Sequence, residues 1–112
     1  MQLRRSVLPN RGGAILDAVG ELDVADVAHL RKAIVDAFTQ GHHCVLVDLS
    51  KVSFIDSTAV TVLLEEHRAA AARGEHLGLV APGEQVRRVL ALLGLDRVLR
   101  VYDSLDDAVA AR

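Results

Sequence analysis

Aromatic side chains are scarce in this sequence, which has two phenylalanines, one tyrosine and no tryptophan among 112 residues. So few rings leave no cluster on which the bases of a nucleic-acid single strand could stack. The charge pattern agrees, because the formal net charge is −2 and no basic block is longer than two residues. We therefore do not expect this chain to bind nucleic acid directly.

Cysteine occurs once, at Cys44, so the chain cannot form an internal disulfide. We interpret Cys44 as a small hydrophobic residue in a buried strand, without a redox role. The run His42-His43-Cys44 could suggest a metal, but adjacent side chains of an extended segment point to opposite faces. No second pair of ligands with zinc-site spacing occurs in the sequence. The sequence therefore predicts neither a metal nor a cofactor.

Long apolar runs are also missing, since the longest are far below the ~20 residues that a membrane-spanning helix needs. No apolar core of a secretory signal follows Arg4 and Arg5. We therefore expect a cytoplasmic protein that does not insert into a membrane. A hydrophobic content of 51% predicts a packed globule, and the length suits one domain over residues 1–112.

Strand-like and helix-like patterns alternate along the chain. Short apolar runs predict strands at 2–8, 14–19, 44–49, 77–80 and 98–102, and the most apolar run, Cys44–Leu49, is expected at the centre of the sheet. The turn residues from Pro9 to Gly13 would join the first two strands as a hairpin. Strands that alternate with crossover helices predict an α/β fold with a mostly parallel mixed sheet, opened by this antiparallel hairpin.

About four helices are expected between and after these strands. Asp23 is interpreted as the N-cap of the first, and His67 lies on the apolar stripe of the second, where we expect a packed imidazole. Ser104 is expected to cap the last, short helix. The predicted helices cover residues 24–40, 57–73, 84–93 and the segment after Ser104.

The segment Phe54 to Thr61, with the sequence FIDSTAVT, carries the most information, because it places an Asp-Ser-Thr triplet between a buried strand and a helix. A hydroxyl at that position lies at a helix N-terminus, where free N–H groups and the helix dipole can hold an added phosphate. Ser and Asp are also ordinary N-cap residues. From residue type alone, capping is the better interpretation of Ser57.

Two further motifs accompany this triplet: Gly20-Glu21-Leu22-Asp23 upstream, and Leu92-Leu93-Gly94-Leu95 downstream, at the end of a helix. With these three motifs at these separations, the chain resembles the STAS-domain family from about Val7 to Val109, and most closely its single-domain anti-sigma factor antagonists. The resemblance implies a single STAS domain that binds an anti-sigma factor and thereby frees a sigma factor.

The resemblance also implies roles for individual residues. Ser57 matches the serine that the anti-sigma factor, itself a serine kinase, phosphorylates; Thr58 is the alternative acceptor, and a phosphatase would reverse the modification. Asp23 would contact the partner in addition to any capping role. Asp56 would orient the turn and set a negative background at the contact surface. Thr61 is included among the expected partner-binding residues.

The chain departs from the family pattern at Ala59 and Thr61, where the family commonly has glycine. Larger side chains there would narrow the approach of a partner, which could weaken or specialise kinase recognition. Another role of the same fold stays open, as a subunit of a membrane lipid transporter or of a stress-sensing complex. Since neither a nucleotide-binding loop nor a catalytic triad can be assigned, we do not expect an enzyme.

Overall fold

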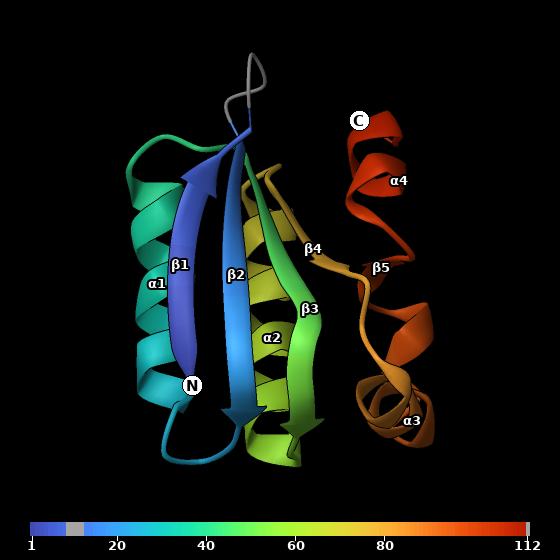
Figure 1. Ribbon diagram of the computed structural model, residues 1–112. Helices are drawn as coiled ribbons and strands as arrows, with labels where there is room; N and C mark the ends of the chain where they lie inside the picture. The colour runs from blue at the N-terminus through green and yellow to red at the C-terminus, as the bar shows by residue number, and fades with distance from the viewer. Residues whose placement is uncertain (9–12, 112) are drawn as a thin grey trace.

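The structure is a computed structural model that describes residues 1–8 and 13–111. Within these residues, two consecutive strands open the fold and helices and strands then alternate, as Figure 1 shows. The strands are β1 (Gln2–Val7), β2 (Gly13–Leu22), β3 (Cys44–Ile55), β4 (His76–Val80) and β5 (Arg100–Tyr102). The α-helices are α1 (Val27–Thr39), α2 (Ser57–Ala72), α3 (Glu84–Leu92) and α4 (Leu105–Ala110), and a 3-10 turn, η1 (Leu95–Arg97), precedes β5.

The strands form one mixed sheet in the order β1-β2-β3-β4-β5. β1 runs antiparallel to β2, with Gln2 opposite Val19 and Val7 opposite Ala14. All other neighbours are parallel. The predicted α/β fold with an antiparallel opening pair is thus confirmed, while most of the predicted hairpin turn, residues 9–12, lies outside the described residues.

Apolar side chains are buried on both faces of the sheet. Val45 and Val47 of β3 belong to the main core with α1, α2 and α3, whereas Cys44 and Leu46 belong to a second cluster with Ala108 of α4. Successive side chains of a strand point to opposite faces, so a strand covered on both sides is apolar at every position. This explains the continuous apolar run that starts at Cys44 and confirms its central place.

β2 and β3 extend further than the sequence predicted. Their parallel pairing continues to Leu22 and Ile55, through residues such as Glu21 and Lys51 that interrupt the apolar pattern. β4 pairs with β3 only as far as Asp48. The last part of β3 therefore projects beyond β4, where polar side chains remain exposed. β5 is shorter than predicted, because the turn that follows η1 continues through Val98 and Leu99 and the strand begins at Arg100.

The prediction that Asp23 caps the first helix is wrong. α1 begins at Val27, with Asp26 in the N-cap position. The Asp23 carboxylate instead accepts a hydrogen bond from the backbone N–H of Ala25 at 3.0 Å, and the Asp23 carbonyl accepts one from the N–H of Asp26 at 2.9 Å. Local side-chain and backbone hydrogen bonds of this kind stabilise a turn in place of a helix start.

The first three helices end within one residue of the predicted positions, and the predicted glycines follow them. Gly41, Gly74 and Gly94 have φ of 97°, 73° and 70°, which is the left-handed conformation that commonly ends a helix. The Ser104 hydroxyl accepts a hydrogen bond from the N–H of Asp107 and caps α4 as expected. Even α2, with 16 residues, is too short to cross a bilayer, and no described helix is long and apolar enough to do so.

Candidate functional site

Asp56 caps α2 and connects it to the loop that follows β2. Its carboxylate accepts hydrogen bonds from the backbone N–H of Ala59 at 3.0 Å, from the Thr58 hydroxyl at 2.5 Å and from the N–H of Val24 at 3.1 Å. Its own N–H donates to the carbonyl of Leu22 at 3.1 Å. Because Leu22 and Ile55 end neighbouring parallel strands, the two loops that follow them meet at one end of the sheet.

These hydrogen bonds favour the ionised form of Asp56. Desolvation raises the pKa of this carboxyl, but the hydrogen bonds from the Thr58 hydroxyl and from the N–H groups of Ala59 and Val24 outweigh it. The pKa of Asp56 is therefore held below its ordinary value. Asp56, rather than Ser57, is the N-cap of α2. The orienting role predicted for Asp56 agrees with these contacts, whereas Ser57 is left without a capping function.

The three hydroxyl groups of the segment differ in what they contact. The Thr58 hydroxyl donates to Asp56, and the Thr61 hydroxyl donates to the Ser57 carbonyl at 2.8 Å. The Ser57 side chain is exposed, and no hydrogen bond within the described part of the chain involves its hydroxyl. Among these hydroxyls, that of Ser57 is the one that a modifying enzyme can reach without breaking an internal hydrogen bond.

Asp23 lies close to this group. It directly follows Leu22, whose carbonyl binds the N–H of Asp56, and directly precedes Val24, whose N–H binds the Asp56 carboxylate. Asp23 is partly buried. The structure therefore brings Asp23, Asp56 and Ser57 to the same end of the sheet, although Asp23 is far from the other two in sequence.

Exposed apolar side chains flank these polar residues. The Val24 side chain is 66% exposed and that of Phe54 is 41% exposed. Val24 contacts Asp56 through its N–H, and Phe54 lies near the end of β3. Exposed apolar side chains next to polar groups also occur in protein-binding surfaces. The sequence analysis quoted Phe54 as part of the motif but gave neither residue a role.

Ala59 and Thr61, which stand where the family commonly has glycine, differ in how much they add to the surface. Ala59 is only 1% exposed and belongs to the core, so its methyl group cannot obstruct a partner at the surface. The expectation that Ala59 narrows the approach is therefore wrong. Thr61 is exposed one turn after Ser57, and its hydroxyl is bound to the helix backbone. Of the two side chains, only that of Thr61 adds atoms to the exposed surface near Ser57.

Gln85 is a positioning residue that the sequence analysis missed. From the start of α3, its side chain accepts a hydrogen bond from the N–H of Ile55 at 3.0 Å and donates one to the Ile55 carbonyl at 3.3 Å. β3 extends past β4, so a side-chain amide replaces the missing neighbouring strand one residue before Asp56. Only knowledge that β3 continues to Ile55 could have indicated the need for this partner.

Gln85→Ala is expected to lower the free energy of unfolding by about 1–3 kcal/mol, because it leaves partly buried backbone groups of Ile55 without partners. Urea denaturation measures this change. Arg88→Ala is the matched control on the same helix, since Arg88 bonds to the exposed Glu84 and should change stability by less than about 0.5 kcal/mol. Equal effects of the two substitutions would contradict a positioning role for Gln85.

The profile of the STAS domain family matches residues 5–108. The chain belongs to the STAS domain family. Among related STAS proteins, the chain is 31% identical over 104 residues to the anti-sigma-F factor antagonist RsfB of Mycobacterium tuberculosis, and the match covers 93% of this chain and 84% of RsfB. The family predicted from the three motifs is thereby confirmed.

Solved structures of other STAS proteins have the same architecture. The crystal structure of an anti-sigma factor antagonist from Mycobacterium paratuberculosis superposes with a TM-score of 0.79, at 28% identity, over 98% of this chain and 93% of that one. SpoIIAA, an anti-sigma factor antagonist, matches in its unphosphorylated form with a TM-score of 0.81, at 24% identity over 98% and 95% of the two chains. SpoIIAA of Bacillus has also been solved in a phosphorylated form, which matches with a TM-score of 0.73 at 22% identity. At these identities, SpoIIAA informs the fold alone.

Proposed function

We propose that this STAS domain is an anti-sigma factor antagonist whose binding is switched by phosphorylation of Ser57. The observation that carries the proposal is the exposed Ser57 hydroxyl at the first position of α2, beside threonine hydroxyls that are already hydrogen-bonded. The name of RsfB, an anti-sigma-F factor antagonist, supports the antagonist part of the proposal. Unmodified, the protein binds an anti-sigma factor and frees a sigma factor; phosphorylated, it releases that partner.

The partner in this proposal is an anti-sigma factor with serine kinase activity, and a phosphatase restores the unmodified state. The proposed contact surface comprises Asp23 and residues at the start of α2, with the exposed apolar side chains of Val24 and Phe54 beside them. Asp56 contributes to this surface mainly by holding the loop after β2 against the start of α2. Thr58 is engaged by Asp56, and Thr61 lies one turn further along the helix. The chain itself acts as a binding protein and not as an enzyme.

The fold can accept a phosphate at Ser57 without rearrangement. The first N–H groups of a helix have no intrahelical partners, and the positive end of the helix dipole favours an anion there. The N–H groups of Ala59 and Thr58 already serve the Asp56 carboxylate and that of Val60 donates to the Asp56 carbonyl, so the helix dipole and solvent are the main support for a phosphate on Ser57. The Asp56 carboxylate opposes the added charge, but the Ser57 side chain is exposed and solvent weakens that repulsion.

In this proposal, the phosphate weakens binding mainly by repelling acidic groups of the partner. A phosphate adds about −1.5 to −2 charges. An acidic partner group about 6 Å away would be repelled by roughly 3 kcal/mol per unit charge at an effective dielectric constant near 20. That corresponds to about a hundredfold in affinity, and half of it, after screening by salt, still corresponds to about tenfold.

Affinity capture tests this proposal and separates it from the transporter alternative. Immobilised wild-type protein and Ser57→Asp are incubated with lysate of the source organism, and bound proteins are identified by mass spectrometry. We expect the wild-type protein to retain an anti-sigma factor of the serine kinase class, and the variant to retain much less. Retention of a transporter ATPase by both baits, without an anti-sigma factor, would contradict the proposal.

A further inference from the structure

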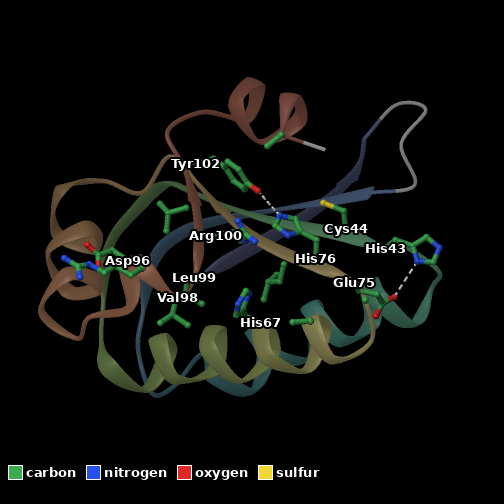
Figure 2. A pocket seen from close by; sticks show the side chains of 16 residues that line it. His43, Cys44, His67, Glu75, His76, Asp96, Val98, Leu99, Arg100 and Tyr102 are labelled. Atoms are coloured by element: carbon green, nitrogen blue, oxygen red, sulfur yellow. Dashed lines mark hydrogen bonds and ion pairs between the residues drawn. The ribbon is translucent and has the colours of Figure 1, made fainter.

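A wide groove lies at the other end of the sheet from Ser57, beside the first residues of β4. Its volume is about 1100 Å³, and Figure 2 shows side chains of α2, β4 and β5 around it. β5 pairs with β4 only from Gly78 onwards, so His76 and Leu77 precede the segment that β5 covers. The groove exists because β5 is short and begins only at Arg100, two residues after the predicted start of the strand.

The groove contains basic groups that lack acidic partners. Within the described residues, neither Arg97 nor Arg100 takes part in any of the ion pairs. Of the acidic residues at the groove, Glu75 is bound to Arg73 and also lies 3.8 Å from His43, whereas Asp96 is exposed on η1. Figure 2 shows Arg100 near the middle of the groove and Asp96 at its far end. The central part of the groove is therefore suited to an anion.

Histidine side chains line the same space. The Nδ1 atom of His67 is buried and has no hydrogen-bond partner within the described part of the chain. Buried polar atoms are rarely left in this state, because each costs about 1–3 kcal/mol. The packed imidazole predicted for His67 thus lies at a wall of the groove with hydrogen-bonding capacity unused. His76 is held in place by the Tyr102 hydroxyl, 3.1 Å from its Nε2 atom.

Glycine at position 78 allows this arrangement. A Cβ atom there would lie 2.9 Å from the Tyr102 ring and 3.1 Å from the Nε2 atom of His76. Tyr102 therefore packs directly over the backbone of Gly78 while its hydroxyl reaches His76. This contact fixes two polar side chains at the groove on the side of the sheet that α4 covers.

Apolar side chains form another part of the lining: Val98 is 41% exposed, and the largely buried Leu77 and Leu99 lie beneath it. Pockets for small molecules typically combine such a lining with a few convergent polar groups, and their volumes are commonly about 300–1,000 Å³. A single inorganic ion would leave most of a space of about 1100 Å³ unfilled. The composition of the groove therefore favours a ligand with an anionic group and an apolar body.

We propose that this groove binds an organic anion, such as a phosphate ester or a carboxylate with a compact apolar body. Arg100 pairs with the anionic group, since a guanidinium matches the geometry of phosphate and carboxylate oxygens. The exposed side chain of Val98 contacts the apolar body above the largely buried Leu77 and Leu99, and the imidazole of His67 lies at the adjoining wall of the groove. This site is separate from the Ser57 surface and does not depend on the function proposed for it.

Phenyl phosphate is a suitable probe, and inorganic phosphate separates the contribution of the apolar body. In NMR titrations of the labelled protein, we expect phenyl phosphate to give saturable shifts at Leu77, Leu99, Arg100 and the His67 imidazole. Arg100→Gln should weaken this binding at least tenfold. Arg88→Gln, an exposed change on α3, is the matched control and should leave it unchanged.

The proposal is contradicted if phenyl phosphate causes no saturable shifts, or if the shifts occur at Ser57 and Thr58 instead. Equal affinity of the wild-type protein and Arg100→Gln would exclude the assigned role of Arg100. Inorganic phosphate that binds as tightly as phenyl phosphate would contradict an apolar contribution from the groove. Arg100 is exposed, so its replacement should not disturb the core. The amide spectrum of each variant verifies that the variant is folded.

Discussion

Ser57→Ala is expected to abolish phosphate incorporation from ATP by the cognate anti-sigma factor kinase, while Thr58→Ala retains most of it. The Ser57 hydroxyl is exposed and has no internal hydrogen bond within the described residues, whereas the Thr58 hydroxyl is 2.5 Å from the Asp56 carboxylate. Phosphorylation of Thr58 would break that hydrogen bond and place a phosphate against a carboxylate. Incorporation of labelled phosphate, followed by peptide mapping, measures the difference.

Both alanine variants must bind the partner and melt cooperatively for this comparison to be valid. Ser57→Ala should meet that condition, because Asp56 and not Ser57 caps the helix. Thr58→Ala removes one hydrogen bond to Asp56 but leaves those from Ala59 and Val24. If labelling persisted in Ser57→Ala and disappeared in Thr58→Ala, the acceptor would be Thr58.

Ser57→Asp is expected to weaken binding of the anti-sigma factor at least tenfold, with part of the loss recovered at high salt. The single added charge repels acidic partner groups across the interface, and salt screens this repulsion. Ser57→Asn is the matched control, because the asparagine side chain has nearly the same shape as aspartate but carries no charge. The affinity of Ser57→Asn should stay close to that of the wild-type protein. Isothermal titration calorimetry at two salt concentrations measures these affinities.

The circular dichroism spectrum and melting curve of Ser57→Asp should remain native-like, since a negative charge at the start of α2 agrees with the helix dipole. Equal losses of affinity in Ser57→Asp and Ser57→Asn would indicate a steric effect in place of an electrostatic one. An affinity loss that accompanies unfolding of Ser57→Asp would replace surface repulsion with destabilisation of the fold.

The parts of the fold that depend on local pattern could be predicted from the sequence. The apolar run from Cys44 identified the central strand, and the glycines after α1, α2 and α3 marked the helix ends. The start of α2 at Ser57 followed from the Asp-Ser-Thr triplet. The ends of β2 and β3 could not be located in this way, because their pairing continues into polar residues that carry no strand periodicity.

The contacts that build the site connect residues distant in sequence, and so the sequence could not reveal them. The N–H of Val24 binds Asp56 across 32 positions, and the Gln85 amide binds Ile55 across 30. Asp23 is followed by a helical pattern and is a common N-cap residue, yet its hydrogen bond to Ala25 stabilises a turn instead. The groove at β4 could not be predicted from the sequence either, since it exists because β5 is short.

The most direct test of the Ser57 switch compares stoichiometrically phosphorylated and unmodified protein as ligands of the same anti-sigma factor, at one salt concentration near physiological. We predict that the phosphorylated protein keeps its fold and binds more weakly than Ser57→Asp, because a phosphate carries nearly two negative charges and a carboxylate only one. Phosphorylated protein that bound as tightly as the unmodified form would contradict the proposed switch.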